Sequence, residues 1–357
     1  MRMDDNQSLA QTIASPEAFF EDVYISFLRA ENAVGGSLVR AFRIGGLEVR
    51  LRFAGAALEP LLTPALRHLS VEPVHSPALT VCLFDTESTG VEPPSPPWSP
   101  EGYIARGDVQ GGSDARFQTG YNVGTGVLSL LDVDRNLAVY WVRSARQVPY
   151  WETGAPLRTL LHWWMRRQGL QLTHAAAVGT SDGAALLAGR GGSGKSTTAL
   201  ACLAAGMLYV GDDYVLLSGS PEPRVYSLYN SAKLDPGQMR HFPELLPALV
   251  NADRLATEKA LAFVHGHLPA RVVQSLPVRV VLLPRITGKT ESRLVAASPA
   301  AALRALAPST IFQLAGAGEE EFRVLSAFVR QIPCFTLELG TDLSQIPAAV
   351  RGALEGG

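Results

Sequence analysis

Residues 189–196 of this 357-residue chain read Gly-Arg-Gly-Gly-Ser-Gly-Lys-Ser, which satisfies the pattern G-x-x-x-x-G-K-[ST]. Glycines at such positions let consecutive backbone N–H groups turn inward at a helix N-terminus, where they cradle phosphates. Lys195 would bring a positive charge to the β- and γ-phosphates, and the Ser196 hydroxyl would be a ligand for Mg²⁺. The pattern therefore predicts a triphosphate-binding loop formed by Gly189, Arg190, Gly191, Gly192, Ser193, Gly194, Lys195, Ser196 and Thr197.

The segments on either side of this loop fit the same interpretation. An apolar run at 184–188 precedes it, as a buried strand would, and an Ala/Leu-rich run follows it and ends at Gly206. A second apolar run at 207–210 then leads into Asp212-Asp213. The order strand, loop, helix, strand and acidic pair is what phosphoryl transfer needs, because a carboxylate must reach the metal at the loop.

The two adjacent carboxylates allow a division of labour. One would lie on the Mg²⁺ side, and the other would accept the proton of an attacking hydroxyl. Successive strand residues point to opposite faces, so both can serve only if the strand ends there and the chain turns, which Gly211 would allow. The alternative is that one of the two is simply a solvated surface residue.

The run from His174 to Leu217 resembles a known family. The segment His174-Ala-Ala-Ala-Val178, the Gly-Lys-Ser loop, the helix ending in glycine and the strand ending in Asp-Asp are similar to the C-terminal domain of HPr kinase/phosphorylase. The run is more similar still to the HPr-kinase-like proteins of bacterial peptide-biosynthesis clusters, including the lasso-peptide tailoring kinases. The resemblance implies a P-loop domain of the phosphoenolpyruvate-carboxykinase-like kind. It also implies an ATP- and Mg²⁺-dependent kinase acting on a serine of a peptide or protein, including a ribosomally made precursor peptide.

The resemblance also implies roles for single residues. Asp212 matches the family's proposed base, Asp213 its metal-side carboxylate beside Ser196, and His174 its site histidine. From the residues alone, His174 would be a structural residue next to the loop strand. Thr197 stands where HPr kinases usually have Glu, and the C-terminal Glu-x-Arg-Gly signature of the bifunctional enzymes is missing. Neither HPr as the substrate nor phosphorolysis is therefore predicted.

Length and hydrophobic periodicity suggest two domains. Residues 1–150 form a β-rich α+β lobe that packs on the second domain or holds the substrate. Its strands are expected at 42–53 around the Gly45-Gly46 turn, and at 78–84, 115–121, 127–133 and 137–144. A helix is expected from Ser15-Pro16, helical spacing covers 58–69, and five prolines exclude regular structure at 92–100. Residues 151–357 form an α/β domain whose mixed sheet carries the loop.

Within the second domain, an amphipathic helix is expected at 156–168, with His162 at its surface or at the edge of the core. A strand at 226–234 would bring Lys233 to the site, and an apolar strand at 278–283 precedes Arg285. Either cation could neutralise charge that develops during phosphoryl transfer, and a solvated surface position is the alternative for both. Residues 251–266 are interpreted as including a loop that orders when substrate binds.

Composition excludes several classes of function. A net charge of −2 argues against a nucleic-acid partner, and no apolar run is long enough for a membrane span. Three scattered cysteines show neither disulfide nor metal spacing, and the polar first 15 residues, expected to fray, contain no signal-peptide core. The expected location is cytoplasmic, and an oligomer is left open.

Two other functions are compatible with the same motifs. One is a small-molecule kinase, and the other is a nucleotide-gated module that captures a peptide without chemistry. A Rossmann-type dinucleotide site is disfavoured, because the loop carries Gly-Lys-Ser rather than G-x-G-x-x-G.

Overall fold

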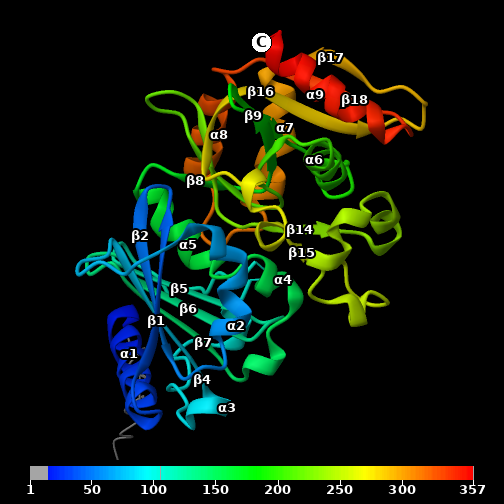
Figure 1. Cartoon of the computed structure of the whole chain (residues 1–357). Coiled ribbons are helices and arrows are strands. Elements are labelled where there is room, and N and C mark those ends of the chain that lie inside the picture. The colour runs from blue at the N-terminus through cyan, green and yellow to red at the C-terminus, as the bar shows by residue number, and fades with distance from the viewer. Residues whose placement is uncertain (1–14, 105, 357) are drawn as a thin grey trace, which may run out of the picture.

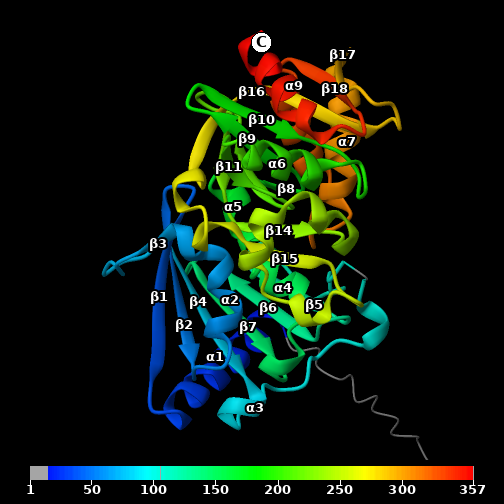
Figure 2. The ribbon, with the colours of Figure 1, turned by 45° about the vertical axis from the view of Figure 1, so that its right-hand side comes forward.

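The chain builds two mixed sheets, one above the other, as Figure 1 and the turned view in Figure 2 show. The computed structural model describes residues 15–104 and 106–356, so most of the N-terminal segment that was expected to fray lies outside it. The first sheet has the order β3-β1-β2-β4-β7-β6-β5. The second has the order β11-β9-β10-β16-β13-β12-β8, with β18 paired to β16 and β17 paired to β18. Both sheets combine parallel and antiparallel pairs, as an α/β protein with mixed sheets requires.

The first sheet follows the alternation read from the sequence. Gly45 and Gly46 both take positive φ and form the two-residue turn of the β1–β2 hairpin. Helix α1 (Pro16–Ala33) begins at Ser15, whose hydroxyl accepts a hydrogen bond from the Ala18 N–H, and its buried phenylalanines cover one face of the sheet. The strands are β1 (Ser37–Ile44), β2 (Leu47–Ala54), β3 (Ser70–Val71), β4 (Leu79–Asp85), β5 (Phe117–Asn122), β6 (Val127–Asp132) and β7 (Leu137–Val142).

The stretch expected to be one helix at 58–69 is broken. It forms the short helix α2 (Glu59–Leu62) and then a 3-10 helix at Pro64–Leu69, because Pro64 cannot donate the hydrogen bond that would continue the first helix. Two more short helices complete this half of the chain, α3 (Thr86–Thr89) and α4 (Tyr150–Gly154).

The second sheet is covered on both faces. Helices α6 (Lys195–Ala204) and α9 (Ile346–Glu355) pack on one face, and α7 (Pro299–Ile311) and α8 (Glu319–Val329) pack on the other. The segment expected to be one strand at 226–234 is divided, and its second part pairs separately in the small sheet of β14 (Ser231–Leu234) and β15 (Ala260–Phe263). The main strands are β8 (Gln171–Thr173), β9 (Ala176–Thr180), β10 (Gly183–Leu187), β11 (Leu208–Gly211), β12 (Val215–Ser218), β13 (Arg224–Ser227), β16 (Ser275–Ile286), β17 (Arg293–Ala297) and β18 (Cys334–Leu339).

The two halves share a hydrophobic core. Helix α5 (Arg158–Arg167) packs its leucines and tryptophans against the first sheet, and the same cluster continues into Tyr214, Leu216 and Tyr229 of the second half. Polar contacts also cross between the halves, since Trp164 Nε1 donates to the Asn136 side-chain oxygen at 2.8 Å. A division of the chain at 150/151 therefore remains a prediction about domains, although the two sheets lie on either side of that point.

His162 corrects one expectation about α5. Its side chain is fully buried, 3.8 Å from the Glu321 carboxylate, rather than at the surface or the edge of the core. Burial lowers the pKa of His162 to about 4, and the nearby Glu321 carboxylate opposes that shift. Along the part of the chain that the structure describes, no helix combines the length and apolarity needed to cross a membrane.

The buried carboxylate of Asp132 is expected to stabilise the first sheet through its hydrogen bonds to two arginines. Its carboxylate is fully buried at the end of β6 and accepts hydrogen bonds from Arg116 at 2.7 Å and 2.9 Å and from Arg135 at 2.5 Å. Burial opposes ionisation, but these hydrogen bonds outweigh it and lower the pKa of Asp132 to about 2. We expect Asp132→Asn to lower the free energy of unfolding by about 1–3 kcal/mol, the partial exposure of both arginines keeping the loss moderate. Urea unfolding at pH 7 measures it.

The stabilisation by Asp132 should also depend on pH. Because its folded-state pKa lies below the ordinary value of 3.8, the stabilisation is complete above that pH and is lost as the pH falls toward about 2. The difference between wild type and Asp132→Asn should therefore shrink in acid. Asp134→Asn is the matched control, because that side chain is 71% exposed. Equal losses for the two variants would contradict the assignment.

Candidate active site

Three strand ends meet at one edge of the second sheet. Strand β9 runs antiparallel to both β10 and β11, with Ala176 opposite Leu187 and Ala177 opposite Gly211. The C-terminal ends of β10 and β11 therefore lie beside the N-terminal end of β9. The phosphate loop follows β10, the acidic pair follows β11, and His174 precedes β9, so these segments are brought together by strand pairing alone.

Two glycines of the phosphate loop take backbone conformations that other residues rarely adopt. Gly192 and Gly194 both take positive φ, at 77° and 104°, and a Cβ added at Gly194 would collide with Leu339 Cδ1. A Cβ at Gly191 would meet no atom within 4 Å. The loop is thus packed against β18 at its end and open at its middle, where a ligand can approach the backbone.

Lys195 lies across this loop. Its side chain is buried, and Nζ donates to the carbonyl oxygens of Gly189 at 2.6 Å and Arg190 at 3.3 Å. Burial lowers the pKa of Lys195, while the nearby Asp212 and Asp213 carboxylates oppose that shift. The Lys195 ammonium group is thus bound to two backbone carbonyl oxygens of the loop, and phosphate oxygens could replace them as its partners.

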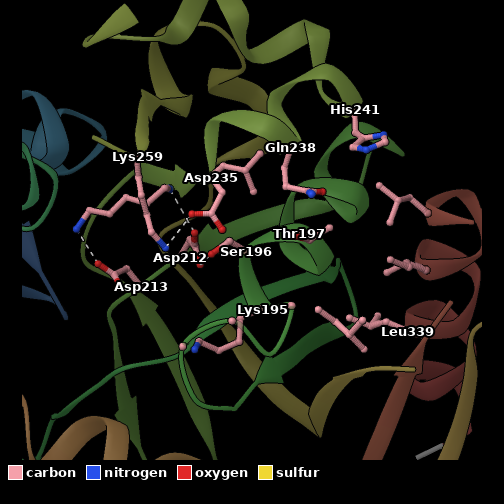
Figure 3. Close-up of a pocket in the computed structure, with 18 of the residues that line it drawn as sticks. Lys195, Ser196, Thr197, Asp212, Asp213, Asp235, Gln238, His241, Lys259 and Leu339 are labelled. Carbon is pink, nitrogen blue, oxygen red and sulfur yellow. Dashed lines mark hydrogen bonds and ion pairs between the residues drawn. The ribbon is translucent and has the colours of Figure 1, made fainter. Parts of the chain in front are cut away.

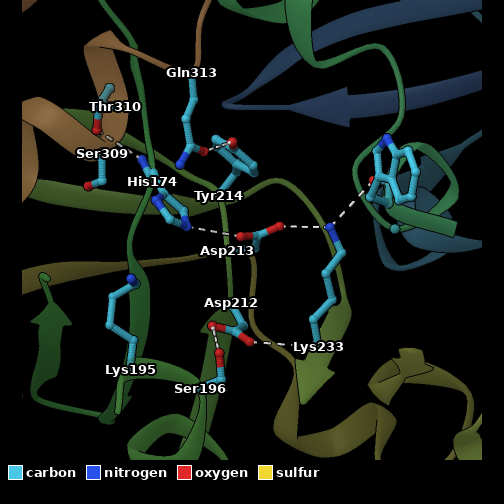
Figure 4. Close-up of polar contacts among 12 residues, drawn as sticks. His174, Lys195, Ser196, Asp212, Asp213, Tyr214, Lys233, Ser309, Thr310 and Gln313 are labelled. Atoms are coloured by element: carbon cyan, nitrogen blue, oxygen red, sulfur yellow. Dashed lines mark hydrogen bonds and ion pairs between the residues drawn. The ribbon is translucent and has the colours of Figure 1, made fainter. Parts of the chain in front are cut away.

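Asp212 pairs with the loop. Figure 4 shows the Ser196 hydroxyl directed at this carboxylate, and Ser196 Oγ donates to Asp212 Oδ1 at 3.1 Å. The carboxylate is 1% exposed, and its other oxygen lies 3.4 Å from the Lys233 backbone nitrogen. Burial raises the pKa of Asp212, and the adjacent Asp213 carboxylate raises it further.

Asp213 has a different set of partners. Oδ1 lies 3.0 Å from His174 Nε2, and Oδ2 accepts from Lys233 Nζ at 2.7 Å (Figure 4). Burial opposes ionisation here too, but the Lys233 charge and the His174 hydrogen bond outweigh it and hold the pKa of Asp213 well below its usual range. The turn expected at Gly211 is made at Asp213 itself, which takes a φ of 71° and so separates the two carboxylates.

These residues line one cavity of about 790 Å³. Among the sequence-predicted residues on its walls are His174, Asp212, Asp213 and Lys233, together with Gly191, Gly192, Gly194, Lys195, Ser196 and Thr197 of the loop. Gly189, Arg190 and Ser193 are not on its walls. Figure 3 shows Asp212 and Asp213 toward one end of the cavity and His241 and Leu339 toward the other.

Arg285 does not reach the cavity, contrary to one of the expectations from the sequence. It was one of two candidates for a second cation at the site, but its side chain pairs with Glu338 and is not on the cavity wall. The reason is strand register, since β16 and β18 run parallel with Arg285 opposite Glu338. Lys233, the other candidate, reaches the site.

Several residues on the cavity wall were not found from the sequence. Trp151 lies in α4, Arg158 begins α5, and Gln313 follows α7, where its Oε1 accepts from the Tyr214 hydroxyl at 2.5 Å. Tyr214 directly follows the acidic pair, and this adjacency was the one available signal. The wall also includes Asp235 and Lys259 near the two aspartates, and Gln238, Arg240 and His241 farther from them (Figure 3).

One solved structure that this chain resembles is the HPr(Ser) kinase/phosphatase from Coxiella burnetii. The match has 13% sequence identity and a TM-score of 0.30, and it covers 51% of this chain and 95% of that one. No protein-family model and no curated protein sequence matches the chain. A match at this TM-score does not establish a shared function, so the functional case depends on the residues of the cavity.

The phosphate loop can be tested without a ligand. We expect Gly194→Ala to lower the free energy of unfolding by about 2–4 kcal/mol, because it combines an unfavourable φ with the overlap on Leu339. Urea unfolding of the free protein measures this loss. Gly191→Ala is the matched control in the same loop, where the added methyl has open space, and it should change stability by less than about 0.5 kcal/mol. Equal stability of the two variants would show that the loop is not packed against β18 in this way.

Proposed function

We propose that this protein is an ATP- and Mg²⁺-dependent kinase that transfers the γ-phosphate to a serine hydroxyl of a peptide or protein. The observation that supports this function best is the separation of partners in one cavity. Asp212 faces the loop hydroxyl of Ser196, and Asp213 faces His174 and Lys233. A phosphate cradle, a metal-side carboxylate and a second carboxylate for the acceptor are the parts that phosphoryl transfer requires.

The residues fit Mg²⁺ at Ser196 and Asp212. A hydroxyl and a carboxylate oxygen 3.1 Å apart are hard oxygen ligands, and Mg²⁺ usually takes one or two such protein ligands and completes its shell with water and phosphate. Over the described ranges, no group of at least three His, Cys, Asp or Glu could hold a metal, which suits such a shared site. The ion would neutralise charge on the β- and γ-phosphates. The metal-side role thus goes to Asp212 in this proposal, where the family resemblance had pointed to Asp213.

Asp213 is then the carboxylate for the acceptor hydroxyl. Each of its oxygens already has one partner, but an ionised carboxylate offers about four lone-pair positions, so an acceptor O–H can still donate to it. Its low pKa makes it a weak base, and a loose transition state needs little proton removal. His174 orients Asp213, and Lys233 supplies positive charge beside it.

A peptide or protein acceptor fits the end of the cavity at Trp151, whose carbonyl oxygen accepts from Lys233 Nζ at 3.4 Å. Trp151 lines this end and is 43% exposed, so an extended segment can enter from solvent along it. A metabolite pocket would bury most of its ligand. The small-molecule kinase is therefore the weaker alternative on this observation.

Substitution of each of the two aspartates should have a different effect in assays of ATP binding and phosphate transfer. Asp213→Asn should lower the rate of transfer by about 10²–10⁴-fold while ATP binding changes little, because it removes the group that receives the acceptor proton. Asp212→Asn should raise the Mg²⁺ concentration needed for ATP binding by about 10–100-fold. Lys195→Ala should weaken ATP binding and abolish transfer. The measurement is the intact mass of a serine-containing precursor peptide after incubation with ATP and Mg²⁺, where transfer adds ~80 Da.

The outcomes distinguish the candidate functions. If Asp213→Asn transfers phosphate at the wild-type rate, Asp213 does not accept the proton of the acceptor hydroxyl. If Asp212→Asn loses transfer while its ATP binding keeps the normal dependence on Mg²⁺, Asp212 is the proton acceptor and Asp213 the metal-side carboxylate. If the wild type binds ATP but phosphorylates only metabolites, the small-molecule kinase is correct. If it captures peptides only with ATP bound and transfers nothing, it is a nucleotide-gated binding module.

A further inference from the structure

The cavity extends well beyond the site of phosphoryl transfer. Figure 3 shows Thr197 directed toward the region between His241 and Leu339, away from Asp212 and Asp213. In a loop of this pattern the lysine meets the β- and γ-phosphates, and the backbone amides hold the α- and β-phosphates. With the γ-phosphate at the two aspartates, the α-phosphate and the nucleoside attached to it would extend past Thr197 into this second region.

The walls of this region differ in chemistry. One wall is aliphatic and consists of Ile286 at the end of β16, Leu339 at the end of β18, and Leu343 and Ile346 at the start of α9. Ile286 is 66% exposed, which is unusual for a large aliphatic side chain beside a cavity. The facing wall is the 3-10 helix η4 (Pro236–His241), which contributes Gln238, Arg240 and His241. An imidazole or guanidinium plane opposite an aliphatic surface suits a flat aromatic ring.

The polar side chains on the walls of this region are too exposed to select one base strongly. Strong discrimination by hydrogen bonding requires buried polar groups that the wrong ligand leaves unpaired. Gln238 is only half-buried, Arg240, His241 and Thr341 are exposed, and the exposed Asp235 carboxylate pairs with Lys259 at 3.3 Å. Stacking and apolar contact remain, and every base offers a ring face for them.

We propose that the region between η4 and the Ile286–Leu339–Ile346 wall is a nucleobase subsite that holds the base by stacking and apolar contact, so that ATP and GTP bind alike. This proposal rests on the kinase function for the direction of the triphosphate. It goes beyond that function by giving the base a site and predicting a broad choice of nucleotide.

The test compares nucleotides with inorganic tripolyphosphate, which has the phosphates but no base. We expect ATP and GTP to bind the full-length protein with Mg²⁺ within about threefold of each other, and each at least about tenfold more tightly than tripolyphosphate. The double variant I286A/H241A should lose this tenfold advantage and leave tripolyphosphate affinity unchanged. The matched control is V295A/H75A, an exposed β-branched aliphatic residue and an exposed histidine outside the cavity. Titration calorimetry measures all the affinities.

Each other result overturns the proposal. A preference of more than about tenfold for one base would show hydrogen-bond selection. Equal affinity for ATP and tripolyphosphate would show that no base subsite exists, with the phosphate loop still intact. If Trp151→Ala rather than I286A/H241A removes the advantage of ATP, the base lies at the acceptor end. If neither the nucleotides nor tripolyphosphate bind the wild type, or if Lys195→Ala leaves their affinities unchanged, the kinase function fails as well.

Discussion

The antiparallel pairing of β9 with both β10 and β11 is the constraint on which the site depends. It places the phosphate loop, the acidic pair and His174 at one sheet edge with very short connections. At the far end of the β9–β10 hairpin, a Cβ added at Gly179 would collide with the Gly183 carbonyl oxygen, so glycine is required there. The alanines of β9 and β10 are fully buried, so the strands that position the site also form part of the core beneath it.

Two carboxylates next to each other in sequence, Asp212 buried and Asp213 partly buried, repel one another unless their environments differ. The backbone at Asp213 resolves this, because its positive φ turns that side chain toward Lys233 and His174 while Asp212 stays beside Ser196. Asp213 is thereby paired with a fixed cation, whereas Asp212 is buried next to a hydroxyl that carries no charge. In the proposed kinase, the bound metal would complete this charge balance, and binding of nucleotide and metal would be coupled for that reason.

The sequence predicts the parts of this site that local pattern controls. Most of the loop, the acidic pair and His174 reach the cavity, because each of these segments follows or precedes a strand whose hydrophobic pattern is clear. Lys233 reaches it from within β14. Prediction fails where long-range pairing decides. The register of β16 with β18 takes Arg285 to Glu338, and packing of α5 between the halves brings in Arg158 and buries His162. Which side chains each of the two aspartates contacts depends on a single backbone angle, the positive φ of Asp213, which the sequence pattern does not predict.

The hydrophobic core shared by the two halves has a consequence for the behaviour of the whole chain. Tyr214 belongs to that core and adjoins Asp213, and Tyr229 donates to the Pro156 carbonyl at 2.7 Å just before α5. Removing the first 150 residues would expose part of this shared core to water near the Asp213 carboxylate. The first 150 residues therefore complete the core of the second half, and we expect the two halves to unfold in one cooperative transition.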